Sequence, residues 1–277
     1  MQVSLNNASF SHPAAKVGAS PAFGPATFVL QAGERVAVIG PSGAGKTTLL
    51  HGLACALKPV SGSALLGSIN PWQISLKQLQ VLRGRLFLAP QASPLPPRQR
   101  VITAVLAGKL AQQSLWVSLR SLFYPMDIAG AHHALARFDL DSKLWDRVDR
   151  LSGGERQRVG LARLLVSNAS LWLVDEPLSA LDPTRADLAI ETLTSTAREC
   201  GATLIASLHQ VDVALTSFDR IIGLRDGLVE FDLPAAQVTE AMLKSLYRSF
   251  EHELAGENAP VIEPIQASAL PIVMNCR

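Results

Sequence analysis

The sequence is poor in the features that mark several common classes of protein. Its three cysteines, Cys55, Cys200 and Cys276, form no C-x-x-C pair, which argues against both a disulfide framework and a zinc site. No stretch approaches the roughly 18 uninterrupted apolar residues of a membrane-spanning helix, and residues 1–10 lack the basic start and apolar core of a signal peptide. We therefore expect a reducing, cytoplasmic environment.

An excess of positive charge is also missing. The chain has 25 lysine and arginine residues against 23 acidic residues, a formal net charge of +2, and no long basic run. Proteins that bind nucleic acid usually cluster lysine and arginine along one face, so we expect no nucleic-acid partner. Apolar residues, at 48% against 17% charged, predict a well-filled core and some apolar surface that meets a partner.

Short apolar segments alternate with helical patterns along much of the chain. Strands are predicted at residues 36–39, 85–89, 171–174, 203–206 and 220–223, and helices at 47–57 and 183–199. This alternation favours an α/β fold with parallel strands. Prolines 94, 96 and 97 then introduce predicted helices at 98–110, 127–138 and 155–167, which indicate a helical subdomain inserted at about 92–167. We expect one domain over 1–250 and a tail, 251–277, that is poorly ordered or covers a surface.

A glycine-rich segment between the first of these strands and its helix carries the clearest chemistry. Gly40-Pro41-Ser42-Gly43-Ala44-Gly45-Lys46-Thr47 fits G-x-x-x-x-G-K-S/T and is followed by Thr48. Its glycines let backbone N–H groups converge on phosphate at a helix N-terminus, Lys46 reaches the terminal phosphates, and Thr47 can ligate Mg²⁺. The segment predicts a nucleotide site.

The strand predicted at 171–174 ends in two adjacent carboxylates, Asp175 and Glu176. Successive side chains of a strand point in opposite directions, so the two acids can take separate tasks. Alone, such a pair is more often the start of a solvated loop. Beside a phosphate loop, we expect Asp175 to hold Mg²⁺ through water and Glu176 to face the attacking water.

Leu151-Ser152-Gly153-Gly154-Glu155 resembles the L-S-G-G-Q signature of the ABC family, and it precedes a helix whose N-terminus suits an anion. A kinase would share the phosphate loop but not this segment. The resemblance spans about residues 3–247. It implies a P-loop NTPase core with a mainly parallel sheet, an antiparallel β-subdomain and an inserted helical subdomain, and it implies binding and hydrolysis of ATP with Mg²⁺.

The same resemblance implies a set of partners. Two ATPase chains would enclose two ATP molecules head to tail, so that Ser152, Gly153 and Gly154 contact the ATP held by the other chain. The other chain is a second copy or a homologous ATPase subunit. The implied complex adds transmembrane permease subunits and, indirectly, a solute-binding protein, and it places the chain peripherally on the cytoplasmic face of the bacterial inner membrane.

Four further residues take roles through the resemblance alone. Gln91 matches the glutamine that contacts Mg²⁺ and water, and His209 matches the histidine that touches the γ-phosphate and supports Glu176. Asp182 matches the loop that crosses the dimer seam, and it also suits a helix cap before a proline. His12 stands near the position of the family's adenine-stacking aromatic residue, with Phe10 as the alternative.

A narrower resemblance is to the ATPase subunits of phosphonate importers, carried by residues 105–110, 114–116, 118–123, 208–212 and 221–227. Glu155 and the 179–180 dipeptide depart from the common motifs, which leaves phosphite, phosphate or another nutrient open as cargo. A non-transport ABC ATPase is a weaker alternative, because such proteins more typically show tandem domains, a long coiled-coil insert or strong basic stripes. In the family's mechanism the solute never enters this subunit. An apolar face with helical spacing could be core or permease contact: Leu115, Trp116, Leu119, Leu122 and Phe123.

Overall fold

The structure is a computed structural model that describes residues 1–12, 14–15, 18, 20–114, 116–118, 120 and 126–248. The predicted tail, 251–277, lies outside the described residues. So do Leu115, Leu119, Leu122 and Phe123 of the predicted apolar face. Trp116, its described member, is 83% exposed. Within the described part of the chain, no helix combines the length and apolar character needed to cross a membrane.

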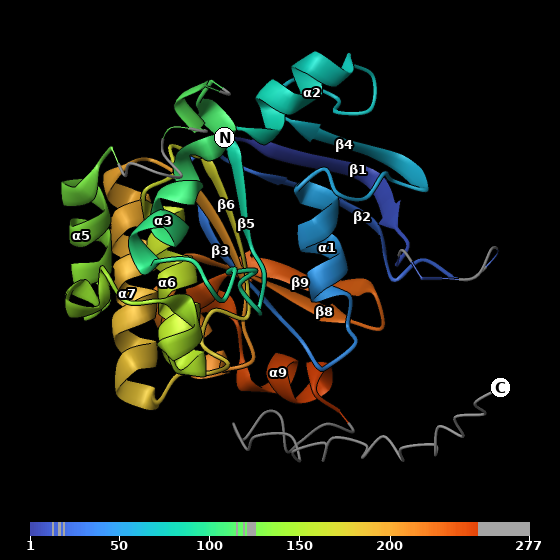
Figure 1. Cartoon of the computed structure of the whole chain (residues 1–277). Helices are drawn as coiled ribbons and strands as arrows, with labels where there is room; N and C mark the ends of the chain where they lie inside the picture. The colour runs from blue at the N-terminus through green and yellow to red at the C-terminus, as the bar shows by residue number, and fades with distance from the viewer. Residues whose placement is uncertain are drawn as a thin grey trace, which may run out of the picture.

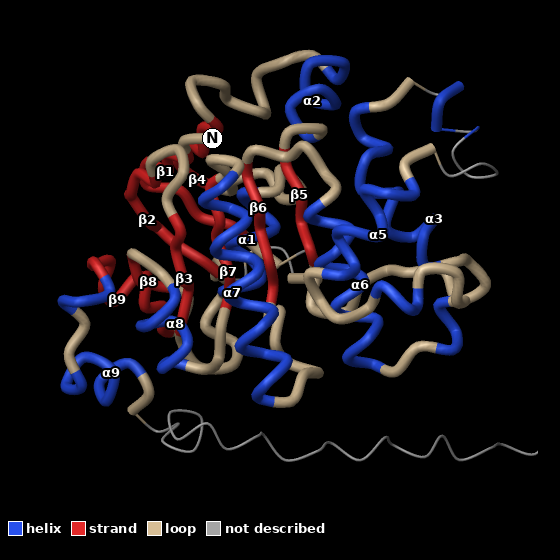
Figure 2. The backbone as a smooth tube through the Cα atoms, turned by 90° about the vertical axis from the view of Figure 1, so that its left-hand side faces the viewer, coloured by secondary structure: helices blue, strands red, loops and turns tan. Residues whose placement is uncertain are grey.

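A six-stranded sheet forms the centre of the molecule (Figures 1 and 2). All its strands run parallel except the last, which returns antiparallel beside its neighbour. In spatial order they are β5 (Leu86–Ala89), β6 (Leu171–Asp175), β7 (Thr203–Ser207), β3 (Arg35–Ile39), β8 (Arg220–Arg225) and β9 (Leu228–Pro234). The predicted strands and the mainly parallel sheet are confirmed.

A second, smaller sheet is antiparallel, as the resemblance implied. Its order is β2 (Phe23–Leu30), β1 (Val3–Phe10) and β4 (Ser61–Leu66). Helix α1 (Lys46–Leu53) contacts β1 and β2 of this sheet and also β6 and β7 of the large sheet. Figure 1 shows α1 on one side of the large sheet and α7 (Pro183–Glu199) on the other. Helix α8 (Val211–Ser217) also packs against α7 and β3.

Alternating side chains of the central strands build a separate core on each face of the sheet. Val36 and Val38 of β3 join the core that contains α1 and the small sheet, whereas Ala37 and Ile39 join the core beneath α7 and α8. Trp172 also joins the latter core. Because both faces of a parallel sheet are covered, its strands read as continuous apolar runs.

A group of helices packs beside the β5 edge and corresponds to the region predicted as helical. Its members contact one another: α3 (Val101–Leu106), α5 (Ile128–Ala136), α6 (Gly153–Leu165) and the 3₁₀ turn η1 (Ala107–Gln112). The helix predicted at 98–110 is thus an α-helix continued by a 3₁₀ turn. Short 3₁₀ turns follow at Asp141–Lys143, Val148–Arg150 and Ala235–Gln237. Two further helices are α2 (Leu76–Arg83) and α9 (Glu240–Leu246).

Two helix boundaries differ from the sequence prediction for local reasons. Helix α1 ends at Leu53 rather than residue 57, because the chain turns through Cys55, whose φ is 57°. Helix α6 begins at Gly153 rather than residue 155, because Ser152 accepts the backbone N–H of Glu155 and the Glu155 side chain accepts the N–H of Ser152. This reciprocal pair is a capping box, which defines the start of a helix.

Candidate nucleotide-binding and hydrolysis site

The carboxyl ends of four neighbouring parallel strands bring most of the predicted residues to one edge of the sheet. The phosphate loop follows β3, and Gln91, the Asp175–Glu176 pair and His209 lie at or just beyond the ends of β5, β6 and β7. In open parallel sheets this edge is where ligands bind. Segments far apart in sequence therefore contribute to one site.

The phosphate loop owes its path to glycines at contacts that exclude a side chain. A Cβ on Gly40, whose φ is 148°, would lie 2.0 Å from the Leu224 carbonyl oxygen. A Cβ on Gly45, whose φ is 96°, would lie 2.4 Å from the carbonyl oxygen of Ala22. The loop thus passes between fixed backbone segments, and Gly43, at φ 81°, needs its glycine for conformation alone, since nothing lies within 4 Å.

Lys46 lies at the start of α1 and is 5% exposed. Its Nζ donates to the carbonyl oxygens of Gly40 at 2.6 Å and Pro41 at 3.1 Å, so the ammonium is held within the loop. Ala44 and Thr48 are buried, whereas Ser42 and Thr47 are exposed. The buried members shape the loop, and the exposed hydroxyls lie where a ligand can reach them.

Glu176 is held through both of its carboxylate oxygens. Oε1 lies 2.5 Å from Nε2 of His209, and Oε2 accepts Nε2 of Gln91 at 2.6 Å. The His209 hydrogen bond, with smaller contributions from the charges of His209 and Lys46, lowers the pKa of Glu176 against the opposing effect of burial. The carboxylate is therefore ionised at neutral pH and positioned as an acceptor. The three predicted side chains form one cluster.

Asp175 depends on Ser207, a residue that the sequence did not point to. Asp175 is 6% exposed, and its Oδ1 accepts the Ser207 hydroxyl at 2.6 Å. The same Ser207 oxygen accepts the backbone N–H of Glu176 at 2.9 Å. One buried hydroxyl thus supports both acids. A serine at the end of an apolar strand was the available signal.

The signature segment forms the N-terminus of α6, away from the chain's own phosphate loop. Figures 1 and 2 both show α6 apart from α1. Ser152 and Gly153 are exposed. The backbone N–H of Ser152 donates to the Glu155 carboxylate, and this bond is the main cause that lowers the pKa of Glu155. The Glu155 carboxylate therefore serves to cap the N-terminus of α6.

Gln157, one turn into α6, joins the signature helix to the acidic strand end. It is 6% exposed, and its Nε2 donates to the Glu176 carbonyl at 2.9 Å while its Oε1 accepts the Ala180 N–H at 3.0 Å. Gly154 packs against the same loop, since a Cβ there would lie 2.7 Å from the Ala180 carbonyl oxygen. The sequence analysis gave Gln157 no role; the available signal was a polar side chain on the apolar face of α6.

Asp182 and the two adenine candidates have distinct surroundings. Asp182 caps α7 by accepting the Arg185 N–H at 3.2 Å, as expected before Pro183, and remains exposed. His12 is exposed. The Phe10 alternative is wrong for this structure, because the ring is 0% exposed and packs on Phe23 at a centroid distance of 6.1 Å. A ring enclosed in the core cannot stack on a nucleotide base.

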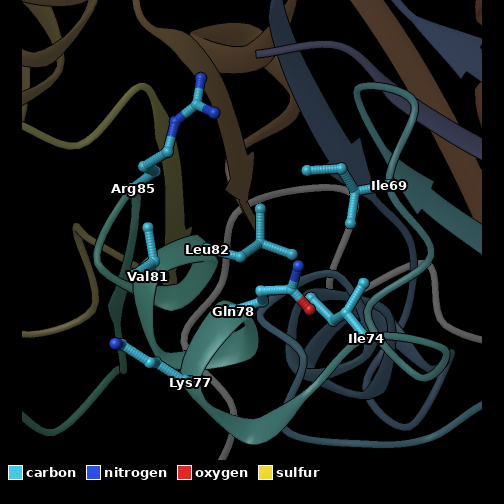
Figure 3. Close-up of a pocket in the computed structure, with 7 residues that line it drawn as sticks. All are labelled: Ile69, Ile74, Lys77, Gln78, Val81, Leu82 and Arg85. Atoms are coloured by element: carbon cyan, nitrogen blue, oxygen red, sulfur yellow. The ribbon is translucent and has the colours of Figure 1, made fainter.

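A separate hollow of about 380 Å³ lies along α2 (Figure 3). Four apolar side chains, a glutamine, a lysine and an arginine line it: Ile69, Ile74, Lys77, Gln78, Val81, Leu82 and Arg85. None of the predicted site residues belongs to this lining. The hollow is therefore distinct from the phosphate-binding edge.

Comparison with known proteins agrees with this arrangement of motifs. Residues 23–179 match the family model described as ABC transporter. The chain belongs to the ABC transporter family. Among its relatives in this family, the phosphonates import ATP-binding protein PhnC 2 of Albidiferax ferrireducens is 64% identical over 277 residues, which cover 100% of both chains. A protein of the same name from Pseudomonas aeruginosa is 54% identical over 236 residues, 85% of this chain and 88% of the relative.

Solved ABC structures have the same fold. The ATP-binding cassette MJ0796, in a dimeric post-hydrolysis state bound to ADP and Pi, matches with a TM-score of 0.69 at 26% identity, over 84% of this chain and 98% of that chain. A bacterial Atm1-family ABC exporter with ATP bound matches with a TM-score of 0.72 at 25% identity, over 92% of this chain and 42% of that chain. The expected α/β fold of an ABC cassette is confirmed.

Proposed function

We propose that this chain is the ATP-hydrolysing subunit of an ABC importer for phosphonates. The observation that carries the catalytic part is the cluster of Glu176, His209 and Gln91 at the sheet edge that bears the phosphate loop. The cargo rests on the names of the relatives, which are phosphonate import proteins. Phosphite, phosphate or another nutrient remains the second candidate, because no residue of this subunit needs to contact the solute.

The chain's residues divide the work of hydrolysis by their positions. Backbone N–H groups of the phosphate loop after Pro41 and the ammonium of Lys46 would hold the phosphates, since Lys46 already donates to loop carbonyls that line the same turn. Glu176, ionised and fixed by His209, would orient the water in line with the leaving phosphate. His12 would contact the base.

The oxygen donors at this edge suit Mg²⁺. Thr47, Gln91 and Asp175 offer hydroxyl, amide and carboxylate oxygens, the ligand types that Mg²⁺ prefers. Among the described residues there is no group of three or more His, Cys, Asp and Glu side chains that could hold a metal, which fits an ion bound by few protein ligands together with phosphate oxygens. When bound, Mg²⁺ would neutralise charge on the phosphates.

A second chain would complete the site. Ser152, Gly153 and Gly154 lie at the N-terminus of a helix that does not adjoin the chain's own phosphate loop, so they can serve the ATP of a partner ATPase subunit. Asp182, exposed at the start of α7, would lie at the seam. We further propose permease subunits as membrane partners, a solute-binding protein as an indirect one, and attachment at the cytoplasmic face of the inner membrane.

The domain organisation belongs to the same proposal. Residues 1–250 would form one nucleotide-binding domain, with residues 92–167 as its helical subdomain. Packing of α3, α5 and α6 on one another beside the β5 edge supports this division. A subdomain joined to the core at two chain crossings can tilt, and such a tilt would carry the signature helix toward or away from a partner's nucleotide.

The test of hydrolysis compares the wild-type chain with Glu176→Gln. The variant should bind ATP but lose turnover, and size-exclusion chromatography with ATP and Mg²⁺ should find it as a closed dimer. Ordinary turnover in the variant would remove Glu176 from the proposed role. Mixing Lys46→Ala chains with Ser152→Ala chains should restore ATP-driven dimer closure. In the mixed dimer one composite site is intact, because it pairs the unchanged Lys46 of one chain with the unchanged Ser152 of the other. No restoration would contradict the head-to-tail arrangement.

The cargo needs an experiment in cells. Deletion of the gene should abolish growth and labelled uptake on phosphonates as the sole phosphorus source, with restoration by the wild-type chain but not by Glu176→Gln. Growth on phosphate serves as the control. Unchanged phosphonate uptake in a strain without a second importer would exclude the phosphonate assignment and leave the ATPase assignment intact.

A further inference from the structure

Tyr247, at the end of α9, reaches the first residue of the phosphate loop. Its side chain is 1% exposed, and its hydroxyl oxygen accepts the backbone N–H of Gly40 at 3.1 Å. The two residues are 207 positions apart in the chain. A buried N–H needs a partner, and here a side chain from the last described helix supplies it.

Gly40 is the point at which the chain leaves the sheet. Ile39 is the last residue of β3 to pair with β8, opposite Gly223. Beyond it, Gly40 turns into the loop at a φ of 148°, and its carbonyl oxygen accepts Nζ of Lys46 at 2.6 Å. Gly40 is therefore held from its N–H by Tyr247 and from its carbonyl by Lys46.

The surroundings of Tyr247 fix where its hydroxyl lies. Leu243 and Leu246 of α9 are buried in the core beneath α7 and α8. Arg225, the last residue of β8, donates from Nη1 to the Ser245 carbonyl at 2.7 Å. Since β8 is the neighbour of β3, helix α9 is fastened to the strand beside the one that leads into the phosphate loop. These contacts hold α9, and with it the Tyr247 hydroxyl, in place.

We propose that Tyr247 is a positioning residue for ATP binding, acting through Gly40 on the phosphate loop and on Lys46; this inference rests on the proposed ATPase function. Loss of the hydroxyl leaves the Gly40 N–H without its partner in a buried place. The loop relieves this by moving toward water, and the carbonyl that holds Lys46 moves with it. The ring itself fills the core, so Tyr247→Phe separates the hydrogen bond from the packing.

The test compares the full-length wild-type chain, Tyr247→Phe and the matched control Thr194→Val. Thr194 is also buried, and its hydroxyl donates within α7 to the Ile190 carbonyl, so the control removes a buried hydroxyl without touching the loop. Tyr247→Phe should weaken ATP affinity and raise KM for ATP about fivefold, the worth of one hydrogen bond, with kcat at saturating ATP within about twofold. Thr194→Val should leave KM unchanged.

Hydrogen exchange supplies a second readout that a purely structural role would not move. Peptides that contain Gly40 should exchange faster in Tyr247→Phe than in the wild-type chain and the control, while peptides from the other strands exchange at the same rate in all three, so that a general loss of stability is excluded as the cause. Unchanged ATP affinity and unchanged exchange in Tyr247→Phe would overturn the inference, and so would an equal rise of KM in Thr194→Val. A wild-type chain that fails to bind ATP would instead overturn the proposed function, which keeps the two failures apart.

Discussion

Replacement of Ser207 by alanine tests whether one hydroxyl supports the acidic strand end. Ser207 is 0% exposed, donates to Asp175 Oδ1 at 2.6 Å and accepts the Glu176 N–H at 2.9 Å. A hydrogen bond to a charged group contributes about 1.5–3 kcal/mol, and an unpaired buried N–H costs about 1–3 kcal/mol. Because the two losses share one small space and are not fully additive, we expect unfolding free energy to fall by roughly 3 kcal/mol.

The measurement is urea unfolding of both chains without nucleotide, so that ligand binding adds nothing to either stability. For a chain of this size, roughly 3 kcal/mol also corresponds to a melting temperature about 6–12 °C lower. Ser167→Ala is the matched control: Ser167 is buried too, but its hydroxyl donates to the neutral Leu164 carbonyl at 2.7 Å. That bond is worth about 1 kcal/mol. Equal losses in the two variants would refute the special contribution of Asp175 and Glu176.

Three other predictions follow from the geometry of the site. Gly40→Ala should lower the unfolding free energy by about 3 kcal/mol or more in a urea titration, because the added Cβ would lie 2.0 Å from the β8 backbone. Gly43→Ala should lower it by only about 1–2 kcal/mol, through backbone strain alone. Equal urea midpoints for the two variants would contradict this difference. The His209 hydrogen bond lowers the pKa of Glu176, so its stabilisation is present above the ordinary value of 4.5 and is lost as pH falls through the folded-state value. Urea midpoints should therefore decline less for Glu176→Gln than for the wild-type chain as pH is lowered from neutral to below 4.5, and parallel curves would show that the bond adds nothing. Gln157→Glu loses the donor to the Glu176 carbonyl, so steady-state ATP hydrolysis should fall about tenfold while ATP affinity stays within twofold; an unchanged rate would exclude the link.

Local patterns were enough to define many elements. Helix α7 has the predicted bounds, because Asp182 caps its start, Pro183 suits its first position and Cys200 and Gly201 end its apolar periodicity. The phosphate loop was readable for a similar reason, since glycines, a lysine and a following helix are adjacent in sequence. These features depend on backbone conformation and side-chain period, which neighbouring residues determine.

The strand order needed the folded chain. Strand β3 precedes β5, β6 and β7 in sequence but lies between β7 and β8 in space. A continuous apolar run indicates that a strand is buried on both faces. All the central strands share this pattern, so the pattern does not predict which strands are neighbours. The resemblance to ABC proteins supplied the expectation that Gln91, Glu176 and His209 meet; the packed sheet brings the three side chains into contact.

The order of residue types along the chain was enough to predict the phosphate loop, the strand that ends in two acids and the signature helix, because each of these features is local. The packing of the folded chain was needed to show that Ser207 supports Asp175, that Gln157 holds the Glu176 backbone, that Tyr247 pairs with Gly40 and that Phe10 is enclosed. Each of these contacts joins residues from separate elements. A serine, a glutamine or a tyrosine has many possible partners in sequence, and close packing of the sheets and helices leaves one within hydrogen-bonding distance.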